Sequence, residues 1–152
     1  MKIYLDAIGC RLNQAEIERF AHQFRLAGHT LVADPHDADL AVVNTCAVTA
    51  AAVADSRQKV RQVTRLGADQ VIVTGCWATL QPAAAAALPA VQRVVLNAEK
   101  DDLVSQALAL PADLIDLEPV ECLALPGARQ VLPGARQRTR AFIKVQDGCD
   151  NH

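Results

Sequence analysis

Three short apolar runs, each leading to a cysteine, constrain the fold of this chain more than any other feature. The runs cover residues 3–8, 40–45 and 71–75, and they lead to Cys10, Cys46 and Cys76. Runs of this length that are rich in valine and isoleucine are typical of buried strands in a parallel sheet. Because parallel strands end at the same edge, we expect all three thiols to lie where open α/β sheets bind their ligands.

The segment after Cys10 has the pattern of an amphipathic helix. Asn13 followed by Glu16 has the spacing of a capping box, so we expect the helix to begin there. Apolar residues then recur at the spacing of one helical face: Ile17, Phe20, Ala21 and Phe24. This stripe is expected to pack against the sheet.

Strand-like and helix-like segments alternate through the rest of the first two thirds of the chain. Further strands are expected at residues 30–33 and 93–96, and further helices at 50–66 and 101–110, with a short alanine-rich helix opening at Pro82. Five strands alternating with helices predict a doubly wound, mainly parallel five-stranded α/β sheet with helices on both faces. In the strand order 2-1-3-4-5, the three strands that lead to cysteines are immediate neighbours.

Domain organisation changes near residue 112. Residues 1–112 are expected to form the α/β domain, and residues 113–140 a linker, because prolines recur there and Leu-Pro-Gly-Ala-Arg-Gln occurs twice. Residues 141–152 begin as a new strand and end in a Gly-Cys loop. We interpret them as the truncated start of a second domain.

Charge and cysteine content narrow the class of protein. No signal-peptide pattern and no membrane-length apolar run is present, so we expect a cytoplasmic protein without a membrane partner. In that reducing compartment, five cysteines indicate ligands or reactive thiols rather than disulfides.

The net charge of −2 excludes a broadly basic surface for nucleic acid. Arg57, Arg61 and Arg65 form a local basic ridge, either a solvated helix face or a contact for phosphate or a partner domain.

One metal cluster held by Cys10, Cys46 and Cys76 is the chemistry that this pattern favours. Thiolates bind iron–sulfur clusters, and three protein ligands on a four-iron cluster leave one iron open. Buried structural cysteines and a three-thiolate zinc site are the alternatives. Trp77 either shields such a cluster or belongs to the core, and Cys122 has no assigned role. A non-catalytic α/β module that binds a nucleotide, a corrinoid or a partner domain is the alternative of a different class.

Four motifs, in this order, closely resemble the radical-SAM methylthiotransferases. They are Gly-Cys-Arg-Leu-Asn-Gln, Val-Asn-Thr-Cys-Ala-Val-Thr, Val-Thr-Gly-Cys-Trp-Ala and Arg-Ala-Phe-Ile-Lys-Val-Gln-Asp-Gly-Cys. The resemblance implies that Cys10, Cys46 and Cys76 bind an N-terminal [4Fe-4S] cluster. It also implies that Cys149 is the first ligand of a C-x-x-x-C-x-x-C loop, which in the parent protein holds a second [4Fe-4S] cluster with S-adenosylmethionine.

The first motif is most similar to the branch that methylthiolates threonylcarbamoyladenosine beside the tRNA anticodon. Other branches modify isopentenyladenosine in tRNA or an aspartate of a ribosomal protein. The resemblance therefore implies a tRNA substrate, together with a radical-SAM barrel and an RNA-binding domain that this chain lacks. It implies that the N-terminal cluster holds or donates sulfur. No catalytic residue and no methylthiotransferase activity are expected of this chain alone.

Overall fold

A computed structural model describes residues 1–109, and at their centre is a five-stranded parallel sheet. The strands are β1 (Lys2–Ala7), β2 (Thr30–Val32), β3 (Leu40–Thr45), β4 (Val71–Gly75) and β5 (Val91–Val95). Their order across the sheet is β2-β1-β3-β4-β5, and every neighbouring pair is parallel. The predicted doubly wound α/β fold and its strand order are confirmed.

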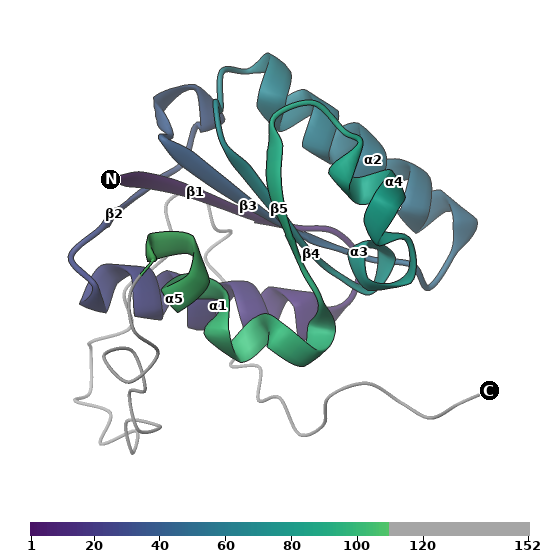
Figure 1. The fold of residues 1–152 in the computed structure, drawn as a ribbon, viewed down its shortest axis with the longest axis horizontal. Helices are drawn as coiled ribbons and strands as arrows, with labels where there is room; N and C mark the ends of the chain where they lie inside the picture. Colours follow the sequence, from purple (N-terminus) through teal and green to yellow (C-terminus); the bar gives the residue numbers. More distant parts are fainter. Residues whose placement is uncertain (110–152) are drawn as a thin grey trace.

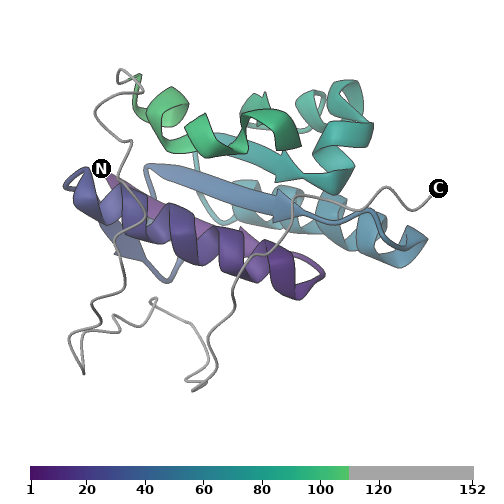
Figure 2. The same cartoon turned by 90° about the horizontal axis from the view of Figure 1, so that it is seen from below.

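Helices cover both faces of the sheet, as Figures 1 and 2 show. On one face lie α1 (Arg11–Leu26) and α5 (Leu103–Leu108), and on the other lie α2 (Ala50–Arg65), α3 (Cys76–Leu80) and α4 (Pro82–Ala86). Two short 3₁₀ helices complete the connections, η1 (Pro35–Asp37) and η2 (Asn97–Asp102). Within residues 1–109, no helix combines the length and the apolar character that crossing a membrane requires.

Strand side chains alternate between two hydrophobic clusters, one on each face. On β3, Leu40 and Val42 join the cluster beneath α1 and α5, whereas Ala41 and Val43 join the cluster beneath α2, α3 and α4. All six residues of β3 are buried, as expected for a central strand covered on both faces. The alternation continues to the end of the strand, so that Asn44 reaches α1.

The first helix packs as its apolar stripe predicts, but it begins differently. Its buried residues include Ile17, Phe20, Ala21 and Phe24. The N-cap is Cys10, whose side chain makes no capping hydrogen bond. The predicted capping box is wrong, because Asn13 and Glu16 are both buried and their side chains bind other elements.

Smaller predictions also need correction. The helix expected at 101–110 is shorter, because the 3₁₀ helix η2 precedes α5. The helix predicted at 50–66 ends at Arg65, one residue earlier, and Leu66 is 43% exposed. The predicted domain boundary at residue 112, the linker at 113–140 and the truncated start at 141–152 lie outside the described residues, as do Cys122 and Cys149.

Candidate metal-binding site

The three predicted ligands lie at the carboxyl ends of three neighbouring strands, a region that we call the cysteine edge. Cys10 lies between β1 and α1 and is exposed. Cys46 directly follows β3 and is only 2% exposed, while Cys76 directly follows β4 as the first residue of α3. The strands β1, β3 and β4 stay paired up to their last residues, so their ends lie at the same level.

The loop that carries Cys10 packs directly on Cys46. Gly9 has a φ of +95°, and a Cβ added to it would lie 2.6 Å from the Cys46 sulfur. Such a distance is too short for any real carbon atom, so only glycine lets the backbone approach the thiol this closely. The backbone of Gly9 therefore packs directly against Cys46, which is only 2% exposed.

Thr45 joins the end of β3 to the loop that carries Cys76. Its hydroxyl donates to the Thr74 carbonyl at 2.5 Å and accepts from the Ala78 backbone N–H at 3.2 Å. Ala78 belongs to α3, the helix that begins with Cys76. Thr45, the residue before Cys46, therefore binds the chain both before and after Cys76.

Ser56 on α2 holds the backbone of Cys46 in place. The Cys46 N–H donates to the Ser56 hydroxyl on α2 at 3.1 Å, and that hydroxyl lies 3.2 Å from the Cys46 carbonyl. Ser56 is completely buried. The position of Cys46 is thus determined by contacts from α2 and from the Gly9 loop.

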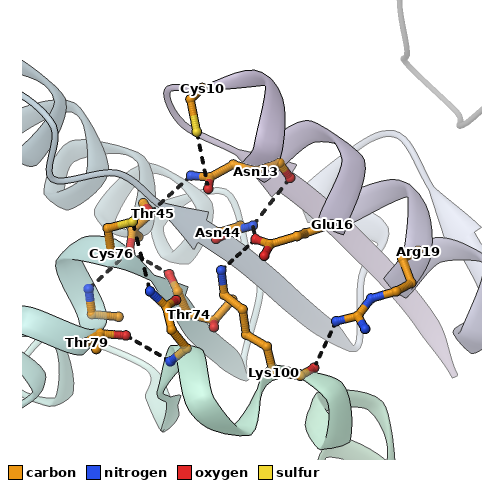
Figure 3. A network of polar contacts seen from close by, with 12 residues as sticks. Cys10, Asn13, Glu16, Arg19, Asn44, Thr45, Thr74, Cys76, Thr79 and Lys100 are labelled. Atoms are coloured by element: carbon orange, nitrogen blue, oxygen red, sulfur yellow. Dashed lines mark hydrogen bonds and ion pairs between the residues drawn. The ribbon is translucent and has the colours of Figure 1, made fainter. Parts of the chain in front are cut away.

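Asn13 connects the two segments that lead to Cys10 and Cys46 (Figure 3). Its side-chain amide donates to the Ile8 carbonyl at 2.7 Å and to the Thr45 carbonyl at 3.1 Å. The Cys10 thiol donates to Asn13 Oδ1 across 3.7 Å. Sequence reasoning treated Asn13 only as a helix cap and missed this contact. Its place three residues after a strand-end cysteine was the one local signal.

A buried ion pair lies in the same polar network (Figure 3). Lys100 on η2 donates to Glu16 on α1 at 2.5 Å, and the two side chains are 6% and 3% exposed. The Asn44 side chain donates to Glu16 at 2.8 Å and to the Asn13 carbonyl at 3.3 Å. No sequence pattern predicted this pair, because its partners are 84 residues apart.

The donor set consists of three thiols from separate loops, the type of ligand that iron–sulfur clusters use. Within residues 1–109, no three His, Cys, Asp or Glu side chains lie close enough together to hold one metal ion, as a three-thiolate zinc site requires. In a four-iron cluster each thiolate binds a different iron, so the sulfurs need not meet at one point. The strand-end cysteines supply the soft thiolates that such clusters prefer. Their role as ligands stays a prediction.

Two buried oxygen atoms at this edge also lack partners. Asn44 Oδ1 and Thr74 Oγ1 make no hydrogen bond within the part of the chain that the structure describes. They belong to residues that face each other on β3 and β4, two positions before Cys46 and Cys76. Buried polar atoms usually have partners, so these two are exceptions that lie close to the cysteines.

Trp77 belongs to the core rather than to the exposed rim of the edge. It is 1% exposed within the cluster beneath α2, and its indole N–H donates to Gln81 at 3.1 Å. The Arg57 guanidinium lies 5.5 Å from the ring centroid and also binds Gln81. One arginine of the predicted basic ridge is thus used inside the domain, while Arg61 and Arg65 remain exposed.

Tyr4, in the middle of β1, has a clearly shifted pKa. Burial and then the neighbouring Asp6 carboxylate raise the pKa of the Tyr4 hydroxyl above its ordinary value. That hydroxyl donates to Asp6 at 2.8 Å, and Lys59 on α2 forms an ion pair with the same carboxylate at 3.0 Å. Tyr4 therefore stays neutral, and the ion pair between Asp6 and Lys59 attaches β1 to α2.

Comparison with known proteins extends what the geometry indicates. Residues 2–97 match the family described as "Uncharacterized protein family UPF0004". The threonylcarbamoyladenosine tRNA methylthiotransferase MtaB of Bacillus subtilis (strain 168) is 33% identical over 152 residues, covering 98% of this chain and 34% of the relative. The enzyme of that name from Chlamydia pneumoniae is 32% identical over 149 residues, covering 97% and 32%.

A relative with a different substrate name also matches. The ribosomal protein uS12 methylthiotransferase RimO of Roseiflexus sp. (strain RS-1) is 30% identical over 172 residues, covering 99% of this chain and 36% of the relative. The chain spans about a third of the length of these curated relatives. It belongs to the UPF0004 family, and the resemblance of its motifs to the methylthiotransferases is confirmed.

Proposed function

We propose that this chain is the cluster-binding, sulfur-handling N-terminal part of a tRNA methylthiotransferase that modifies threonylcarbamoyladenosine. The observation that carries the proposal is the cysteine edge, where three separate motifs place thiols at the ends of three adjacent strands. The substrate is supported by the relatives whose printed names contain threonylcarbamoyladenosine. Because the chain spans about a third of these relatives, the whole activity would belong to a longer parent protein.

The residues of the chain have separate tasks in this proposal. Cys10, Cys46 and Cys76 would bind one [4Fe-4S] cluster, which when bound supplies an open iron that holds or donates sulfur. Gly9 and Thr45 keep the three loops in contact. Cys149 would be the first ligand of a second [4Fe-4S] cluster, which binds S-adenosylmethionine. The remaining ligands would come from parts of the parent protein that this chain lacks, and we expect the chain alone to be inactive.

Anaerobic reconstitution tests the cluster directly. Incubation of the reduced chain with iron and sulfide is expected to load about four irons per chain and to produce a visible absorption band. Cys10→Ala, Cys46→Ala and Cys76→Ala are each expected to prevent stable loading, because each removes the only thiolate for one iron. Iron and sulfide analysis with absorption spectra measures the result.

Cys122→Ala is the matched control, since it removes a thiol that the proposal does not use. This variant should load as much iron as the unchanged chain. A colourless unchanged chain, or full loading of Cys46→Ala, would show that the cysteines are incidental. The alternative function, a non-catalytic α/β module, would then be favoured.

The substrate branch needs a separate measurement on the full-length parent protein. With S-adenosylmethionine and a reductant, we expect it to add a methylthio group to tRNA that carries threonylcarbamoyladenosine, detected by mass spectrometry of digested nucleosides. The RimO relative makes ribosomal protein uS12 the second candidate substrate. Modification of uS12, or of tRNA with isopentenyladenosine, in place of the first substrate would reassign the branch and leave the cluster proposal standing.

A further inference from the structure

The Asn13 side chain makes its contacts with the two segments that carry predicted ligands. It is 1% exposed, and its amide nitrogen uses both hydrogens, one on the Ile8 carbonyl and one on the Thr45 carbonyl. Ile8 comes two residues before Cys10, and Thr45 comes directly before Cys46. One side chain therefore joins the chain segment before the first cysteine to the segment before the second.

The chemistry of these contacts requires an amide. Carbonyl oxygens only accept hydrogen bonds, so the Asn13 nitrogen must face Ile8 and Thr45, and its oxygen must face the Cys10 thiol. Aspartate has the same shape but no donor when ionised, and alanine has neither donor nor acceptor. Glutamine is one methylene longer, so it cannot place its nitrogen at the same point.

We propose that Asn13 is a positioning residue that fixes the separation of Cys10 and Cys46 for cluster binding. The proposal rests on the function proposed above, since it concerns how the same site is held. The two amide hydrogen bonds keep the Gly9 loop against the Cys46 sulfur, in the arrangement that only glycine permits at that position. Because the amide binds the segments before both cysteines, it limits how far the two thiols can separate.

The surrounding network holds Asn13 itself in place. Its backbone carbonyl accepts from the Asn44 amide, which also donates to Glu16, so the first turn of α1 is attached to β3. The rest of α1 is held by its apolar residues Ile17, Phe20 and Phe24 in the core. Loss of the Asn13 amide should therefore loosen the cysteine loops more than it destabilises the helix.

The test compares iron release with folding in the reconstituted 152-residue chain. In Asn13→Ala and Asn13→Asp, we expect a chelator to remove iron roughly 10–100-fold faster than in the unchanged chain, the range for residues that orient metal ligands. Loss of visible absorption measures the rate, and urea unfolding of the metal-free chain measures the fold. Ile17→Ala is the matched control on α1, because it weakens the core without touching either loop. It should lower stability while releasing iron at the unchanged rate.

The outcomes separate this proposal from the one on which it rests. If the unchanged chain binds a cluster and Asn13→Ala releases iron no faster, the role of Asn13 is wrong while the cluster assignment stands. If the unchanged chain binds none, both fail. Should Asn13→Ala not fold, Asn13→Ser is measured instead. Serine retains one donor, so a release rate between those of the unchanged chain and Asn13→Asp supports the proposal, and an unchanged rate overturns it.

Discussion

Replacing Gly75 by alanine is expected to destabilise the metal-free chain by about 4 kcal/mol. Gly75 has φ +100° and ψ −174°, a backbone region that essentially only glycine occupies. An added Cβ would lie 2.5 Å from the Thr45 nitrogen and from Asn44 Oδ1, and closer still to the Thr45 carbonyl oxygen. The Thr45 atoms belong to β3, so relief requires separating β3 from β4. Urea unfolding followed by circular dichroism measures the loss.

Alanine substitutions at two other glycines are expected to cost less stability than Gly75→Ala, so the three variants form a graded series. Gly28 has φ +82° but no atom within 4 Å of an added Cβ, so Gly28→Ala isolates the backbone strain, about 1 kcal/mol. At Gly9, the added Cβ would lie 2.5 Å from Cys46 Cβ, but Gly9 is in the exposed Cys10 loop, which can shift more easily than a strand, so the loss should fall between the other two. If Gly75→Ala costs no more than Gly28→Ala, the close approach of β4 to Thr45 is wrong.

The strands of the sheet could be predicted because each is recognisable from a short stretch of sequence. A run such as residues 40–45 is buried on both faces, and its composition alone indicates a central strand. The strand order followed from the alternation of strands and helices, which leaves few arrangements for a parallel sheet. The glycines before Cys10 and Cys76 lack a side chain and so can let other segments approach closely. They do, with the backbone of Gly9 against Cys46 and that of Gly75 against Thr45.

The polar interior of the site could not be predicted in the same way. Asn13 and Glu16 satisfy the local pattern of a capping box, and nothing in that pattern reveals that both are buried. Their real partners come from β3 and η2, and Lys100 lies 84 residues beyond Glu16. Periodicity gives the face of a helix, but it does not give the polar partners that distant segments supply.

The sequence therefore predicted where the three cysteines lie, but not the contacts that hold their loops in place. The carboxyl-edge positions of Cys10, Cys46 and Cys76 follow from strand ends, which the apolar runs define. The burial of Cys46 depends on Gly9 packing over it, a tertiary contact that no spacing rule contains. The ligand role of the three cysteines stays a prediction that reconstitution will decide.

Replacing Lys100 by methionine is expected to cost about 3–5 kcal/mol of folding free energy, although methionine has a similar length. Glu16 stays buried in this variant and keeps the Asn44 amide, but it loses the ammonium that lies 2.5 Å away. A buried carboxylate without its countercharge is strongly unfavourable, because the desolvation of the charge is no longer offset. Urea unfolding of the metal-free chain measures the change.

A second variant and a surface pair separate this effect from a simple loss of packing. In Glu16→Gln with Lys100→Met, no charge remains buried and the glutamine oxygen can still accept from Asn44, so at least half of the stability should return. Asp101, beside Lys100, pairs with Arg19 on the same two elements, but its side chain is 75% exposed, so Asp101→Asn should cost less than about 1 kcal/mol. Equal losses in Lys100→Met and in the double variant would mean that the stability is lost because methionine packs poorly at position 100, and not because the Glu16 charge is unpaired. The buried charges would then contribute little to holding α1 beneath the cysteine edge.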